Sequence, residues 1–188
     1  MNDQSLGHYL EAVLFVADEP IPTLDLAVLF EVTAAHMEQQ LKLLARDLQS
    51  AGRGIVLRQV AGGWRLATHP DTAEFLERFV GEQRSPRLSR AALETLAIVA
   101  YRQPISRGQL AEIRGVSCDG VLRTLLSRGV VTEIGRDSGP GQAILYGTTS
   151  VLLERLGLDS LSELPSLADY MPDGVTVQRM ESGLGPGL

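Results

Sequence analysis

The chain has 188 residues, a mass of 20.3 kDa and a net charge of −6, with 44% hydrophobic and 21% charged residues. This composition is typical of a globular protein and excludes a collagen-like or wholly disordered chain. The longest uncharged apolar run, residues 12–17, is too short for a transmembrane helix, and no secretory signal is expected. A single cysteine, Cys118, excludes an internal disulfide. We therefore expect a soluble cytoplasmic protein without membrane contact.

The first part of the chain predicts three helices. Apolar residues at helical spacing over residues 6–16 indicate an amphipathic helix that ends before a Pro-Ile turn. A short second helix follows with Thr23 as its expected N-cap, and a third helix begins after the N-cap Thr33. The third helix carries an apolar stripe formed by Met37, Leu41, Leu44 and Leu48.

The pattern then changes to alternation. Residues 55–60 and 64–68 alternate around the Ala-Gly-Gly sequence at 61–63, which predicts a β-hairpin. A helix over residues 71–80 closes this part of the chain. Three helices followed by a hairpin form a winged helix-turn-helix domain.

The same order of elements returns about 83 residues later, a spacing too long for a solenoid. Residues 93–100 (LETLAIVA) align with residues 10–17 (LEAVLFVA), and a Pro-Ile pair follows each stretch. The expected N-caps of the second copy are Ser106 and Ser117. The period indicates two copies of one small domain.

The second copy also ends in a hairpin and a helix. Its predicted strands, residues 130–134 and 143–146, flank a glycine-rich wing at 135–141, and the closing helix covers residues 150–156. The predicted fold class is mainly α with small β-hairpins, as two tandem winged helix-turn-helix domains.

The domain limits follow from composition. The expected units are an N-terminal domain over residues 1–83, a polar linker over 84–88, a C-terminal domain over 89–157 and an acidic, flexible tail over 158–188.

The second half resembles the segregation and condensation protein B family. The resemblance rests on residues 88–106 (LSRAALETLAIVAYRQPIS) and on four shorter motifs. These are IRGV at 113–116, GRD at 135–137, GPG at 139–141 and LYGTT at 145–149. The first domain matches more loosely, through residues 10–17 and 62–66. Two departures, Gln142-Ala143 after the wing and the segment 117–120, concern local contacts and leave the fold unchanged.

The resemblance implies a function. Members of this family are accessory subunits of the bacterial SMC–kleisin condensin complex, which acts in chromosome condensation and segregation during cell division. They pair through the first domain, and the dimer binds the kleisin, segregation and condensation protein A (ScpA), largely through the second domains. Through ScpA they join the SMC ATPase. The resemblance therefore implies a homodimeric adaptor at the nucleoid that is not an enzyme and carries no cofactor.

A winged-helix DNA-binding transcription regulator is the alternative. Such proteins read bases with Arg, Lys, Asn or Gln near the start of the third helix. The corresponding residues here are Thr33, Ala34, Ala35, His36 and Glu38 in the first copy, and Ser117, Cys118, Asp119 and Gly120 in the second. Neither set makes a bidentate contact with guanine, so DNA contact is expected to be weak and indirect at most. The arginines of residues 84–90 are the candidates for such a contact, while Arg107 and Arg123 would matter for a regulator.

The sequence contains no recognisable metal or catalytic site. Its histidines, His8, His36 and His69, lack the spacing of metal ligands. Cys118 is expected to fill a gap in the core. The segment around Ser117 lacks the second glycine of a nucleophile elbow.

The candidate binding residues lie on two surfaces. A dimer interface is expected at Phe75, Leu76, Phe79 and Val80, because these residues, with Leu29 and Phe30, exceed the apolar surface that so small a domain buries. The candidate partner-binding residues of the second domain are Arg136, Tyr146, Arg102 and Arg114. For the wing itself, a plain hairpin loop and a partner contact remain equally open.

Overall fold

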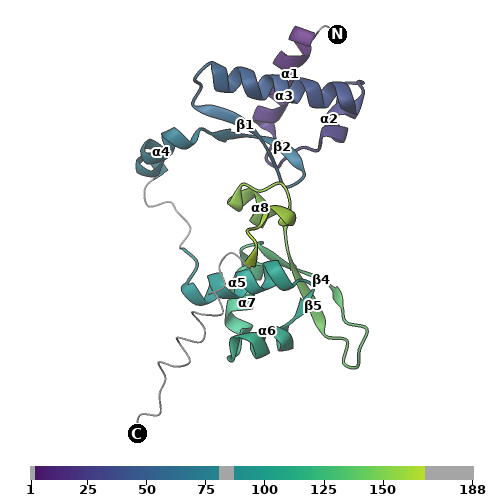
Figure 1. Cartoon of the computed structure of the whole chain (residues 1–188), viewed down its shortest axis with the longest axis vertical. Coiled ribbons are helices and arrows are strands. Elements are labelled where there is room, and N and C mark those ends of the chain that lie inside the picture. The colour runs from purple at the N-terminus through teal and green to yellow at the C-terminus, as the bar shows by residue number, and fades with distance from the viewer. Residues whose placement is uncertain (1–2, 81–86, 168–188) are drawn as a thin grey trace, which may run out of the picture.

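The computed structural model describes residues 3–80 and 87–167, and its two halves fold around separate hydrophobic cores (Figure 1). The mixture of helices with small antiparallel sheets confirms the predicted fold class. The predicted domain limits stay a prediction. Of the predicted linker and tail, residues 84–86 and 168–188 lie outside the described residues.

The first half contains three core helices and a hairpin. Its elements are α1 (Asp3–Val16), α2 (Thr23–Leu29), α3 (Ala34–Ser50), β1 (Ile55–Val60), β2 (Gly63–Thr68), the 3₁₀ turn η1 (Pro70–Thr72) and α4 (Ala73–Val80). Side chains four residues apart on α1, namely Leu6, Leu10 and Leu14, are buried against α2 and α3. Strands β1 and β2 pair antiparallel and cover this core.

A tight turn fixes the register of the first hairpin. Val60 pairs with Gly63, so only Ala61 and Gly62 form the loop, with φ of 53° and 78°. Positive φ at both residues is the geometry of a type I′ turn, whose twist matches that of the strands. Gly63 is required for a different reason, since a Cβ there would lie 2.8 Å from the carbonyl carbon of Pro20.

The prediction of Thr23 as the N-cap of α2 is wrong. The N-cap is Pro22, which makes no side-chain cap bond. The Thr23 hydroxyl instead accepts a hydrogen bond from Nε1 of Trp64 at 3.1 Å and donates to Glu38 at 3.0 Å. A buried indole N–H requires an acceptor, and Thr23 supplies it. The prediction of Thr33 as the N-cap of α3 is confirmed, because its side chain accepts from the backbone N–H of His36.

The second half repeats the plan with an additional short strand. Its elements are α5 (Arg90–Arg102), β3 (Ile105–Ser106), α6 (Arg107–Arg114), α7 (Asp119–Ser127), β4 (Val131–Arg136), β5 (Ile144–Thr148), α8 (Ser150–Leu156) and the 3₁₀ turn η3 (Leu161–Glu163). The sheet has the order β3–β5–β4. Strand β3 was not predicted, because it is only two residues long and begins with the isoleucine of the Pro-Ile pair, so it shows no alternation of apolar and polar residues.

The helix starts of the second half confirm one prediction and correct another. Ser106 caps α6 in a capping box, in which its side chain and that of Gln109 each bond the other's backbone N–H. Ser117 is not the N-cap of α7, because Cys118 occupies that position and its carbonyl accepts the first helical bond from Leu122. Cys118 is buried in the second core, as expected of a gap-filling residue.

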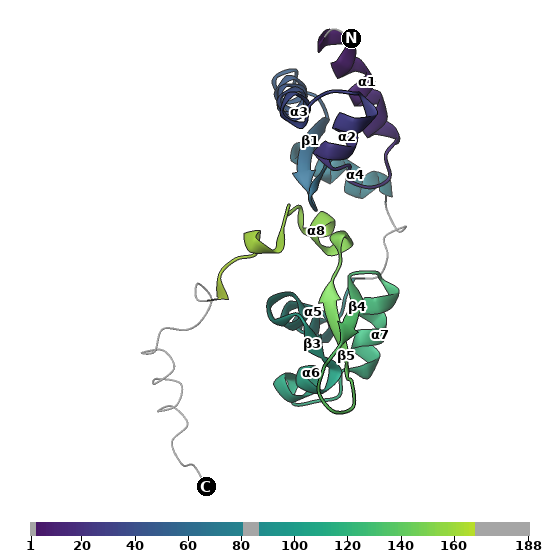
Figure 2. The same cartoon turned by 90° about the vertical axis from the view of Figure 1, so that its right-hand side faces the viewer.

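The two closing helices pack differently. No residue of α4 is buried, and the helix projects from the first half (Figure 1). In α8, Leu152 is buried in the second core. Figure 2 shows, from a second direction, that α8 lies between the two halves. The closing helix of the repeat is thus exposed in the first half and partly buried in the core in the second half.

The capping box gives a stability prediction. Ser106→Ala removes the acceptor for the Gln109 N–H, and loss of an N-cap costs about 1 kcal/mol. For a domain of this size, that corresponds to a fall in the midpoint of thermal unfolding of about 4–8 °C. Circular dichroism measures the shift. The matched control is Ser127→Ala, whose hydroxyl donates only to the Thr124 carbonyl. Equal midpoints for the two variants would contradict the assignment.

Glu38 gives a prediction for acid conditions. Partial burial raises the pKa of the Glu38 carboxyl, but hydrogen bonds from Lys42 and Thr23 and the charge of Lys42 outweigh burial and hold its pKa below the ordinary 4.5. A lowered pKa in the folded state contributes stability that is present above pH 4.5 and is lost as the pH falls through the folded-state value. We expect Glu38→Gln to flatten this part of the urea-denaturation profile against pH. An unchanged slope in this variant would refute the role of Glu38.

Candidate protein-binding surfaces

Helix α4 carries two exposed aromatic residues, one of them the most exposed aromatic side chain among the described residues of the first half. The side chains of Phe75 and Phe79 are 68% and 87% exposed, and Val80 is 41% exposed, while Leu76 is half-buried. The predicted dimer residues therefore form one apolar face, named here the α4 face. A helix of eight residues is only marginally stable alone in water. The α4 face is chemically suited to pack against another apolar surface.

A second apolar surface lies on the same half of the molecule. Phe15 and Val16 at the end of α1 are 79% and 77% exposed, and Val28 and Leu29 of α2 are 79% and 59% exposed. Of the two residues that the sequence adds to the α4 face, Leu29 is exposed and Phe30 packs against the core. Sequence reasoning missed Phe15 and Val28, because both lie in helical patterns whose buried face is set only by tertiary packing.

The second wing presents Arg136 to solvent. Arg136 ends β4, and its guanidinium donates to the carbonyl of Gln142 across the wing at 3.3 Å. The neighbouring Ile134 is 51% exposed. A register shift between Glu133 and Gly135 marks a β-bulge in this strand, and bulges re-aim side chains at the edge of a sheet. The strand of the wing thus offers one exposed cationic side chain and one exposed apolar side chain.

Tyr146 lies on the same hairpin but is 7% exposed. It occupies β5, opposite Ile105 on one side and Glu133 on the other. The Tyr146 ring also lines a shallow cavity of about 260 Å³ with Arg107 and Ile144. Because Arg136 pairs with Ile144, the structure brings Arg136 and Tyr146 to neighbouring places on one sheet.

The other two candidate arginines have different surroundings. Arg102 is exposed at the end of α5. The Arg114 side chain is only 14% exposed and forms an ion pair with Glu94 at 2.9 Å. It also donates to the carbonyl of Ala91 at 2.9 Å and to the Thr95 hydroxyl at 3.3 Å. Arg114 therefore joins α6 to α5, which leaves little of its charge for an external partner.

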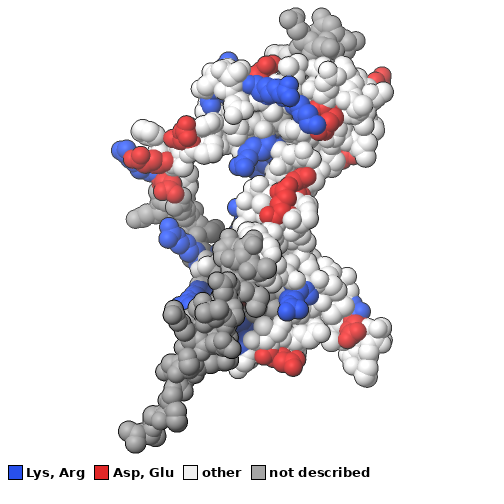
Figure 3. All heavy atoms as spheres, viewed as in Figure 1, with Lys and Arg blue, Asp and Glu red and all other residues white. Residues whose placement is uncertain are grey.

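The starts of the third helices carry no base-reading side chain. In the second half, Asp119 begins α7 and pairs with Arg107 at 3.1 Å. An acidic group at this place repels phosphate and neutralises the nearest arginine. On the face in Figure 3, Lys and Arg side chains are interspersed with Asp and Glu, without a continuous basic band.

Residues 3–80 and 87–167 contain neither a metal cluster nor a membrane-spanning helix. In that part of the chain, no cluster of three His, Cys, Asp or Glu side chains has a geometry that holds a metal ion. No described helix combines the length and the apolar character that crossing a membrane requires.

Comparison with known proteins agrees with the sequence motifs. The family described as "Segregation and condensation complex subunit ScpB" matches residues 8–167. Segregation and condensation protein B of Desulforamulus reducens is 43% identical over 168 residues, which cover 89% of this chain and 92% of the relative. The protein of the same name from Moorella thermoacetica is 48% identical over 164 residues, covering 85% and 82% of the two chains.

Two solved structures are also similar in sequence. ScpB from Mycobacterium tuberculosis is 41% identical and aligns over 84% of this chain and 98% of its own, with a TM-score of 0.43. A dimer of an ScpB N-terminal domain, complexed with a ScpA peptide, is 28% identical over 41% of this chain and 96% of its own, with a TM-score of 0.39. The family match spans both halves and every motif on which the resemblance rests. The chain belongs to the segregation and condensation protein B family.

Proposed function

We propose that this chain is a non-enzymatic, homodimeric adaptor that binds the kleisin ScpA and, through it, the SMC ATPase of a condensin complex. Its work is chromosome condensation and segregation during cell division, in the cytoplasm at the nucleoid. Family membership over residues 8–167 supports the place in the complex. The observation that carries the adaptor role is the α4 face, an aromatic helix surface that the chain's own core leaves exposed.

The dimer is proposed to form between first halves. Transfer of a phenylalanine side chain from water into an apolar contact contributes about 1.5–3 kcal/mol. In a two-fold dimer, α4 of one copy meets the second copy, and the reverse contact occurs as well, so each favourable contact is made twice. The exposed apolar residues of α1 and α2, Phe15 and Val28 among them, are the proposed receiving surface.

ScpA is proposed to bind the second half. The wing strand supplies Arg136 and Ile134, both exposed, and the adjoining cavity supplies Tyr146. Arginine and tyrosine are frequent anchors of protein interfaces, and an amphipathic partner helix needs such a mixture of apolar and charged contacts. Arg102 is a candidate at the rim. Arg114, already bonded to α5, is proposed to hold α6 in place for this surface.

The adaptor role is favoured over a DNA-binding transcription regulator. A regulator needs base-reading side chains and a basic face, whereas Asp119 stands at the start of α7 and pairs with Arg107. Any DNA contact through Arg87 and Arg90 is proposed to be weak, since Arg90 already pairs with Glu94.

The dimer proposal predicts the effect of a charge on the α4 face. Phe79→Asp puts a carboxylate where an apolar contact is proposed, and we expect the dimer dissociation constant to rise about 100-fold or more. Light scattering after size-exclusion chromatography at micromolar concentration should give the single-chain mass of 20.3 kDa for the variant and twice that for the wild type. Val116→Asp, which changes a 57% exposed apolar residue of the second half, is the control that stays dimeric. A dimeric Phe79→Asp variant would refute the assigned interface.

The ScpA proposal predicts a separate loss. Arg136→Ala removes an interface anchor and should weaken ScpA binding at least fivefold, since such anchors contribute more than about 1 kcal/mol. Isothermal titration calorimetry with purified ScpA measures the change. Arg53→Ala, an exposed arginine of the first half, is the matched control and should bind as the wild type does. Equal affinities for all three proteins would remove the wing from the interface, and no binding by the wild type would refute the proposed function.

A further inference from the structure

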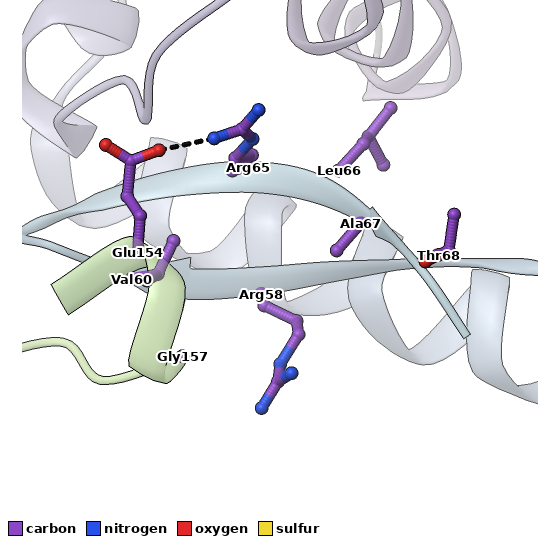
Figure 4. A pocket seen from close by; sticks show the side chains of 8 residues that line it. All are labelled: Arg58, Val60, Arg65, Leu66, Ala67, Thr68, Glu154 and Gly157. Carbon is purple, nitrogen blue, oxygen red and sulfur yellow. Dashed lines mark hydrogen bonds and ion pairs between the residues drawn. The ribbon is translucent and has the colours of Figure 1, made fainter. Parts of the chain in front are cut away.

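The two halves of the chain meet through polar contacts made by α8 and by residues 157–165, named here the strap. Helix α8 belongs to both halves. Its N-terminal part is fixed in the second half, where Leu152 is buried and the Thr149 side chain donates to the Gly129 carbonyl. Its C-terminal part faces the first hairpin, where Glu154 pairs with Arg65 of β2 (Figure 4). The Glu154 side chain is only 16% exposed, so solvent screens this pair less than a surface pair.

The strap continues this contact at the tip of the first hairpin. The carbonyl of Leu158 accepts from the backbone N–H of Ala61 at 2.9 Å. The Asp159 carboxylate accepts from the backbone N–H of Gly62 at 2.9 Å and from Nε2 of Gln59 at 3.2 Å. The positive φ of Ala61 and Gly62 turns successive N–H groups of the loop outward, an arrangement that binds anions. Asp159 supplies an anionic acceptor for one of these two groups, the Gly62 N–H, while the Leu158 carbonyl accepts from the other, the Ala61 N–H.

Both ends of the strap are anchored in the second half. At one end, the N–H groups of Gly157 and Leu158 close α8 by bonding to its carbonyls. At the other end, the hydroxyl of Tyr101 on α5 donates to the carbonyl of Pro165 at 2.7 Å. Between them, Glu163 accepts from the N–H of Asp159 at 2.9 Å, which holds Asp159 in its orientation. The strap therefore binds the hairpin tip of the first half while both of its own ends are bonded to the second half.

The junction is not closed by an apolar core. A cavity of about 390 Å³ remains beside the contact, lined by residues of β1, β2 and α8 that include Arg58, Leu66 and Glu154 (Figure 4). Packed apolar interfaces hold domains rigidly, whereas smaller polar ones permit relative motion. The orientation of the halves thus depends on a few charge-assisted hydrogen bonds.

We propose that Glu154 and Asp159 form a releasable clamp that sets the angle between the two winged-helix domains of one chain. When the clamp is closed, Asp159 is bonded to the tip of the first wing and the second half has a fixed orientation relative to the first. When it opens, the halves remain joined by the chain and turn independently. The clamp is a property of the single chain and does not depend on ScpA.

Distance measurement between the halves tests the clamp. Exposed residues Gln39 on α3 and Arg123 on α7 are replaced by cysteine and spin-labelled, which is selective because Cys118 is buried. Each labelled chain is diluted into excess unlabelled chain, so that a dimer carries one labelled copy. We expect one narrow distance distribution for the parent protein and a width at least twofold larger for Glu154→Ala with Asp159→Ala.

Two controls make the outcome decisive. Asp137→Ala changes an exposed carboxylate on the distant second wing and should leave the width unchanged. Asp159→Asn keeps an oxygen for the Gly62 N–H without the charge, and we expect an intermediate width. Circular dichroism confirms folding of each variant. A double variant as narrow as the parent, or a parent as broad as the double variant, would overturn the proposal without affecting the test of ScpA binding.

Discussion

The burial of apolar side chains in two small cores is the constraint on which the rest of the molecule depends. In the first half, α1, α2, α3 and the hairpin already enclose one another, and no residue of α4 is buried. In the second half, the corresponding helix α8 buries Leu152 and turns its other end to the neighbouring domain. One duplicated helix therefore leaves its apolar face exposed, while its counterpart packs within the chain.

Local sequence patterns were sufficient for most of the fold. The helices, the two hairpins and the N-caps Thr33 and Ser106 depend on residues a few positions apart in sequence. They can therefore be predicted without knowledge of the tertiary structure. The prediction of Thr23 as an N-cap was wrong, because its hydroxyl bonds Trp64 and Glu38, which are distant in sequence. The start of α7 was predicted one residue too early, because Ser117 is a favoured N-cap residue by type, whereas the buried Cys118 is the N-cap in the structure.

The candidate sites likewise divide into features set by local sequence and features set by tertiary packing. The exposure of the α4 face was predictable, since the number of large apolar residues exceeds what a small domain encloses. The surroundings of Arg114 were not, because its contacts with Ala91 and Thr95 arise only when α5 and α6 pack. The contact of Gly62 with Asp159 joins the turn of the first hairpin to the segment after α8, 97 residues later, and no periodicity in the sequence signals it.

Winged-helix proteins meet DNA through the start of the third helix and through the wing, and both places are altered in this chain. At the start of α7, Asp119 neutralises Arg107. At the tip of the first wing, the carboxylate of Asp159 accepts from the backbone N–H of Gly62, a donor that would otherwise be available to a phosphate. In each case an acidic side chain takes the position that a nucleic acid would need, and the apolar faces are left exposed instead. The scaffold is thereby suited to bind proteins, in keeping with its family.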